Sequence, residues 1–203
     1  MGMSHMYLTA IIDWFSRLIV GWRLSELLDT APVIEAVRAA IGKYGTPAII
    51  NSDRGNDGTS FRMFTSDDYI GLLADFRIRQ SMDGKGRWAD NVVIERFFRS
   101  LKVENIYIFD YCNPRELRLG ISGYIDKYNS LRPHQSLGYK TPYEFYHSCE
   151  ILYKLLIRLC HFVFSFFGLD KSVIIICKSS YQNGSMSRAV RRGHSRRLAG
   201  LKK

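Results

Sequence analysis

Residues 7–22 read YLTAIIDWFSRLIVGW, and this stretch decides the fold. It starts a pair of short runs, Tyr7–Phe15 and Leu18–Leu24, which are apolar and rich in β-branched residues. Only Ser16 and Arg17 separate the two runs. Such a pair is typical of two antiparallel strands joined by a tight turn. The sequence therefore predicts a β-hairpin near the start of the chain.

Downstream of the hairpin, helix and strand signals alternate. A cap at Asp29 or Thr30 with Pro32 in the first turn begins a helix that ends at Gly45, and Thr65 or Ser66 caps another. Further helices are expected at 90–106, at 114–129 and from 141, strands at 48–50 and 78–82, and a loop at 54–64. This order predicts an α/β fold, a mixed sheet flanked by helices.

The net charge of +10 invites a nucleic-acid interpretation, but the charge is unevenly distributed. Residues 1–150 contain 18 Lys or Arg and 18 Asp or Glu, whereas residues 151–203 contain 11 basic residues and one acid. Net charge therefore says nothing about what the first 150 residues bind. The four cysteines lack zinc-finger spacing and no signal peptide is visible, so we expect reduced thiols in a cytoplasmic protein.

The C-terminal segments differ from the rest of the chain. Residues 148–178 are apolar, but their longest uncharged run, Leu159–Leu169, has 11 residues, whereas a membrane helix needs about 20. We expect no membrane span and leave the structure of this segment open. Residues 179–203 are rich in Ser, Gly and Arg and are predicted to be a disordered basic tail. Two interpretations of this tail stay open. It could bind nucleic acid non-specifically through its charge, or its charge could have no function.

Two carboxylates are candidates for chemistry. Asp53 follows the buried strand at 48–50, and Glu95 lies one turn into the long helix. Converging carboxylates supply the oxygen ligands that hard divalent cations need, and a bound Mg²⁺ assists phosphoryl transfer. The alternative is a turn acid and a solvated helix residue. Glu95, Arg99 and Lys102 share one helix face, and Lys85 lies in the glycine-containing loop before it, an arrangement that suits phosphate contacts.

Several motifs in order resemble the integrase core of bacterial insertion-sequence transposases. The matching segments are 7–22, NSDRG (51–55), FTSDDY (64–69), 78–104 and YNSLRPHQSLGYKTPYEF (128–145). The resemblance covers about residues 3–147 and implies an RNase H-like fold with an Asp-Asp-Glu triad. It further implies Mg²⁺- or Mn²⁺-dependent strand cleavage and strand transfer, and a multimer on transposon ends.

Carried over by motif, Asp53 matches the second triad acid and Glu95 the last, both as metal ligands. Asn91, Arg99 and Lys102 fall at positions that line the site or the DNA. The spacing between the two acids exceeds the family's by six residues, which an insertion at 57–62, DGTSFR, would explain. In the family the first acid lies on a strand before YLTAIID, so we expect this chain to lack its first strand and that acid.

Three hypotheses follow. The first is a polynucleotidyl transferase core acting on transposon ends and target DNA, in a bacterial, nucleoid-associated protein. The second is an inactive remnant that at most binds DNA or a full-length transposase. The third, a small basic nucleic-acid-binding protein, is opposed by the motif series. His134 is expected to make a structural or substrate-side hydrogen bond rather than to bind metal, because no second His lies near it in the sequence.

Overall fold

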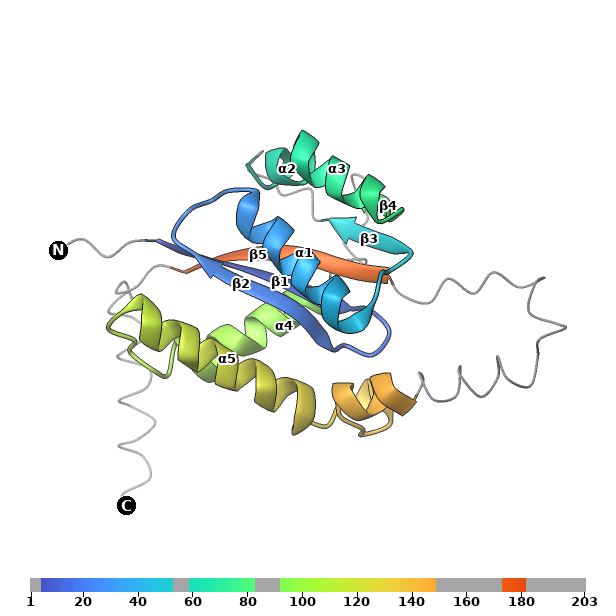
Figure 1. Ribbon diagram of the computed structural model, residues 1–203. Helices are drawn as coiled ribbons and strands as arrows, with labels where there is room; N and C mark the ends of the chain where they lie inside the picture. Colours follow the sequence, from blue (N-terminus) through green and yellow to red (C-terminus); the bar gives the residue numbers. More distant parts are fainter. Residues whose placement is uncertain (1–4, 53–58, 83–91, 149–172, 182–203) are drawn as a thin grey trace, which may run out of the picture.

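The computed structural model describes residues 5–52, 59–82, 92–148 and 173–181 (Figure 1). Its centre is a five-stranded mixed sheet. The strands are β1 (Met6–Asp13), β2 (Ile19–Ser25), β3 (Ile49–Ser52), β4 (Arg79–Met82) and β5 (Val173–Tyr181), in the spatial order β2-β1-β5-β3-β4. β1 is antiparallel to β2 and β5, and β3 is parallel to β4 and β5.

Strand β5 corrects the predicted sheet. The strand that the family places before YLTAIID would be central, and we expected its position to be open; instead β5 lies between β1 and β3 and pairs with both (Figure 1). Strand β5 also crosses the predicted boundary between the apolar segment (148–178) and the basic tail (179–203). Ser179–Tyr181 are therefore in a strand rather than in a disordered tail. The physical reason is that both inner edges, β1 and β3, offer unpaired backbone groups, which an apolar β-branched run can satisfy.

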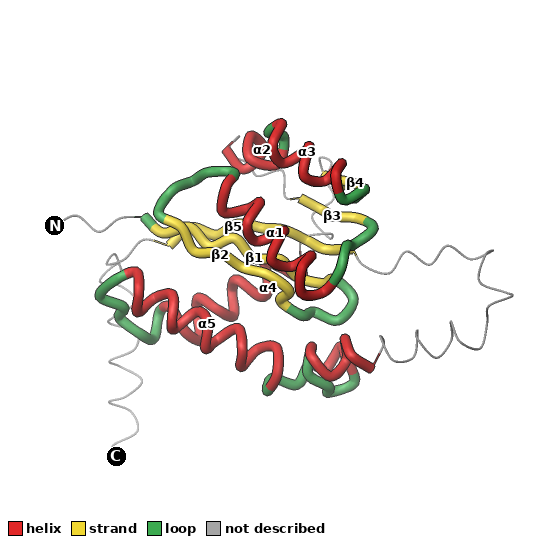
Figure 2. Tube along the Cα trace, viewed as in Figure 1, coloured by secondary structure: helices red, strands yellow, loops and turns green. Residues whose placement is uncertain are grey.

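Helices cover both faces of the sheet (Figure 2). On one face lie α1 (Ala31–Tyr44), α2 (Thr59–Phe64) and α3 (Asp67–Asp75). On the other lie α4 (Val92–Leu101), which continues as a π-helix over Lys102–Ile106, and α5 (Pro114–Ser130). A short 3₁₀ turn at Gln135–Leu137 and a helix over residues 142–148 follow.

Alternation along β1 divides the core in two. Leu8, Ala10 and Ile12 pack with α4 and α5, whereas Ile11 packs with α1 and α3. Gly21 in β2 lets α1 approach closely, because a Cβ there would lie 2.9 Å from the carbonyl oxygen of Ala36. The two cores therefore hold the helices firmly against both faces of the sheet.

Local signals gave most of the helices correctly. Ser66 caps α3, with its hydroxyl accepting from the N–H of Tyr69 at 3.3 Å. Thr141 and Glu144 form a reciprocal capping box at the predicted last helix. Two predictions were wrong. Thr30 begins α1 without a side-chain cap, and α2 occupies part of the predicted loop at 54–64, including residues 59–62 of the proposed insertion.

Among the described residues, no helix is both long and apolar enough to cross a membrane.

Candidate active site

The carboxyl end of β3 is fixed by a buried polar network. Ser52 is fully buried and its hydroxyl lies 3.2 Å from that of Tyr69 in α3. Burial raises the pKa of Tyr69 to about 12, so this phenol stays protonated at neutral pH. From β4, the side-chain amide of Gln80 donates to the carbonyl of Phe64 at 2.8 Å. β3 therefore ends at a defined point against α3 and β4, one residue before Asp53, which itself lies outside the described residues.

Helix α4 presents Glu95 to solvent. Its apolar side chains, Ile94, Phe97, Phe98 and Leu101, are buried in the core shared with β1 and α5. Glu95 and Arg99 are both exposed, as their helical spacing predicted. Within the described part of the chain, Glu95 forms no ion pair with Arg99 or any other residue. Its carboxylate is therefore available as an oxygen ligand for a hard cation.

The remaining predicted contact residues are only partly described. Lys102 is half-buried and starts the π-helix at the end of α4. A π turn is wider than an α turn and often occurs at functional sites. Lys85 and Asn91 lie outside the described residues. The structure thus describes three of the six predicted site residues, Glu95, Arg99 and Lys102, all on one continuous helical segment.

The described residues contain no group of three or more His, Cys, Asp or Glu that could hold a metal ion. A metal held by Asp53 and Glu95 would thus rest on two carboxylates, one of them outside the described part. The exposed Glu95 carboxylate fits the chemistry of such a site, but two charged ligands are few for Mg²⁺ unless substrate oxygens and water complete its shell.

Asp13 is not a third member of this pair. The β1–β5 register pairs Asp13 with Ile174, and Ile174 pairs with Ile50 in β3. Asp13 is therefore level with the middle of β3 and not with its carboxyl end. Its side chain is buried and accepts from the backbone N–H of Ser16 at 2.8 Å. Burial also raises the pKa of this carboxyl. Its bonds with Ser16 show that Asp13 closes the turn after β1.

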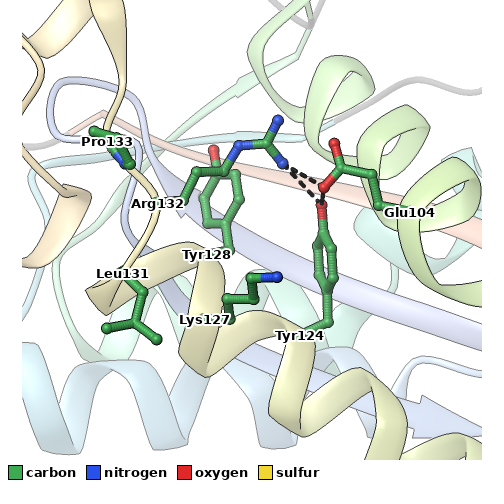
Figure 3. A pocket seen from close by; sticks show the side chains of 7 residues that line it. All are labelled: Glu104, Tyr124, Lys127, Tyr128, Leu131, Arg132 and Pro133. Carbon is green, nitrogen blue, oxygen red and sulfur yellow. Dashed lines mark hydrogen bonds and ion pairs between the residues drawn. The ribbon is translucent and has the colours of Figure 1, made fainter.

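A second polar region lies where α5 ends, and sequence analysis missed it. Arg132 Nη1 lies 2.6 Å from the Glu104 carboxylate and 3.2 Å from the Tyr124 hydroxyl (Figure 3). These groups line a cavity of about 250 Å³, together with Lys127, Tyr128, Leu131 and Pro133. The RPH motif at 132–134 was the only signal in the sequence, and its partners lie on other elements.

Comparison with known proteins assigns the chain to a family. Two family models, both described as an integrase core domain, match residues 1–87 and 76–142. The chain belongs to the integrase core family. The sheet with helices on both faces is accordingly the RNase H-like α/β fold of integrase catalytic cores, as the motifs implied.

Curated relatives of this integrase core are transposases of Escherichia coli K12. The transposase InsF for insertion sequence IS3A is 32% identical over 143 residues, which cover 69% of this chain and 48% of the relative. The putative transposase InsK for insertion sequence element IS150 is 33% identical over 142 residues, with the same coverage. The integrase core therefore spans about half the length of the curated relatives it matches.

Solved structures agree on the fold. The catalytic core domain of BIV integrase superposes with a TM-score of 0.58 at 20% identity, covering 72% of this chain and 89% of that one. The HTLV-2 integrase catalytic core domain, solved in complex with magnesium, gives a TM-score of 0.53 at 22% identity, covering 70% and 85%. Because the sequence identities are low, this structural likeness establishes only that the chain shares the fold of these catalytic cores.

Proposed function

We propose that this integrase core acts on DNA in the transposition of an insertion sequence, with Asp53 and Glu95 as metal-binding carboxylates. The observation that carries the proposal is the match of residues 1–142 to the integrase core models, together with curated relatives that are transposases. Transposon ends and target DNA are the proposed substrates. Self-association, or association with a full-length transposase, is the proposed assembly.

In this proposal Asp53 and Glu95 hold Mg²⁺ or Mn²⁺. When bound, the ion would polarise a phosphoryl oxygen of the DNA backbone. The chain's own residues bind and orient the DNA. Arg99 and Lys102 on the helical segment of Glu95, with Lys85 and Asn91 before it, contact backbone phosphates and keep the strand beside the carboxylates. Glu95 supports this role because it is exposed and carries no ion pair within the described residues.

A second candidate function rests on strand β5. The strand that pairs with β3 reads VIIICKSSY and contains no carboxylate. With Asp53 and Glu95 as the proposed acidic ligands and none from β5, we expect weak metal binding and little or no turnover. In this alternative the chain is an inactive remnant that binds DNA or a full-length transposase.

A Mn²⁺ titration followed by EPR tests the metal site. We expect weak binding that Glu95→Gln abolishes. The matched control is Glu35→Gln, which removes the same charge from an exposed position of α1, on the other face of the sheet, and should leave binding unchanged. Equal effects of the two variants would refute the role of Glu95.

Strand transfer on transposon-end DNA separates the two candidate functions. We expect no Mg²⁺- or Mn²⁺-dependent strand transfer by this chain alone, because two carboxylates are too few. Activity that Glu95→Gln abolishes would establish the catalytic function instead. Cys177→Asp is informative here, because Cys177 directly follows Ile176, which pairs with Ser52 at the end of β3. If a third carboxylate is what is lacking, this variant should bind Mn²⁺ more tightly than the wild type.

A further inference from the structure

Tyr128 in α5 lies near basic side chains from three other segments, the β1–β2 turn, α4 and the loop after α5. Its buried ring lies edge-on to the imidazole of His134, with ring centroids 4.9 Å apart. The positive charges of Arg132 after α5, Arg17 in the β1–β2 turn and Arg96 in α4 act on the Tyr128 phenol. Burial raises the pKa of this phenol to about 12, and the three guanidinium groups oppose that rise. Three guanidinium groups thus act on this neutral phenol, and one imidazole contacts its ring.

Among the described residues, the acids near this cluster do not balance its charge. Glu104 pairs with Arg132 at 2.6 Å. Asp13 lies near Arg17, but its carboxylate is held by Ser16, and burial raises its pKa, which weakens its negative charge. In the described part of the chain no acid pairs with Arg96. Like charges held together in a partly buried place repel one another unless an anion neutralises them.

Two atoms of the cluster also lack hydrogen-bond partners. Arg17 Nη1 and His134 Nε2 are buried, and neither has a partner among the described residues. Burying such groups without partners is unfavourable, so the native structure normally supplies a partner from the protein, from water or from a ligand. The two atoms come from the β1–β2 turn and from the loop after α5, and both side chains lie near Tyr128. Arg17 Nη1 is a donor, and His134 Nε2 is a donor in the tautomer that carries the proton there, so a small anion that reaches both atoms would satisfy them.

We infer that Arg17, Arg96 and His134 form a binding site for a phosphate group, and that the backbone of DNA supplies it. The inference rests on the proposed action on DNA. Guanidinium groups match phosphate oxygens in charge and in fork geometry, and they bind them more directionally than a lysine does. Arg96 directly follows Glu95 in α4, so a phosphate bound here would hold DNA beside the helix of the proposed metal ligand. This site would add one contact with the DNA backbone to the contacts proposed for Arg99 and Lys102.

The salt dependence of DNA binding measures this contact. Each neutralised phosphate contributes about −0.9 to the slope of log Kobs against log salt concentration. With a 30-base-pair random-sequence duplex and the full chain, we expect Arg96→Gln and Arg17→Gln each to make the slope shallower by roughly one unit. Arg96 is exposed, so its variant should fold normally, and thermal unfolding verifies this. The matched control is Arg38→Gln at an exposed position of α1, on the opposite face of the sheet, which should change the slope far less.

The outcomes distinguish this inference from the proposed function. If the wild-type chain does not bind the duplex at all, the proposed action on DNA fails, and this inference fails with it. If the wild type binds but Arg96→Gln and Arg38→Gln give the same slope, only the inference is overturned. Reduced self-association of Arg96→Gln with unchanged DNA binding would assign the cluster to a protein carboxylate and would also overturn it.

A titration with inorganic phosphate separates free phosphate from DNA phosphate as the ligand. In NMR spectra of the guanidinium Nε–H groups, we expect phosphate to shift the Arg17 and Arg96 signals but not that of Arg38. The duplex should produce shifts of the same two signals at far lower concentration. Shifts caused by phosphate alone would make the site one for free phosphate and would contradict the assignment to DNA.

Discussion

Gly120 and Gly123 show how differently one residue type acts within a single helix. From the sequence, both weaken α5, because glycine in a helix interior costs about 1 kcal/mol relative to alanine. The structure distinguishes them. A Cβ at Gly120 would collide with the phenol of Tyr111, whose hydroxyl donates to Asn105 Oδ1 at 2.9 Å, whereas a Cβ at Gly123 meets nothing within 4 Å. Gly120 is therefore required by packing, and Gly123 is not.

We expect Gly123→Ala to stabilise the protein by about 0.5–1 kcal/mol through helix propensity. Gly120→Ala should instead destabilise it by about 1–3 kcal/mol, because the tyrosine ring must move and leave its hydrogen bond. Urea unfolding of the two variants measures both effects. A stabilised Gly120→Ala protein would mean that Tyr111 can leave this position at no cost.

His134 should make stability depend on pH. Burial lowers its pKa below the usual 6.5, and the nearby Arg132 and Arg17 lower it further. The Tyr128 ring that it contacts remains neutral in this range. The unfolded chain therefore takes up a proton at this residue before the folded protein does, as the pH falls through 6.5. The stability contributed by neutral His134 is present above pH 6.5 and is lost as the pH falls toward the folded pKa.

Urea unfolding at pH 7.5 and pH 5.5 checks this prediction. The wild type should lose more stability between the two values than His134→Gln, which cannot titrate. Asp13 acts in the opposite direction, because its raised pKa favours the folded state at lower pH; the wild type and His134→Gln share this contribution, so the comparison between them removes it. An unchanged pH dependence in His134→Gln would rule out this residue as its source.

At the scale of elements, β5 is the feature that local sequence did not predict. The helices were predictable because each carries its own signals, such as Ser66 before α3 and Pro114 at the start of α5. The run VIIIC in β5 has the composition of a strand, but nothing near it in the chain offers a partner. Its partners, β1 and β3, are distant in sequence, so periodicity could not assign it.

A proline tests whether β5 is a central strand. Ile175 pairs with Ile12 of β1 and Asn51 of β3. Proline has no N–H to donate and is tolerated almost only at sheet edges, so Ile175→Pro should cost about 3 kcal/mol or more. Ile175→Val is the matched control, because it keeps a β-branched residue. Circular dichroism during heating measures both variants. Equal melting temperatures would show that β5 does not hold the sheet together.

For the whole molecule, the motifs predicted the fold well. The alternating elements gave the α/β class, and the ordered motifs gave the integrase core, which the family models confirm. The roles of the site residues remain predictions: Asp53, Lys85, Asn91, Glu95, Arg99 and Lys102. The cationic cluster at Tyr128 could not be predicted, because it draws residues from positions 17, 96, 128 and 134, and only folding brings them together.

The central place of β5 also bears on how the protein is made. Met6 of β1 pairs with Tyr181 of β5, so the β1–β2 hairpin and the β3–β4 pair join one sheet only after the ribosome has released the chain through Tyr181. During synthesis the inner edges of β1 and β3 both stay open, and open edges recruit other strands. Contacts between such distant segments also form slowly. The nascent chain therefore passes through a late, association-prone stage, in which a chaperone would have the greatest effect on yield.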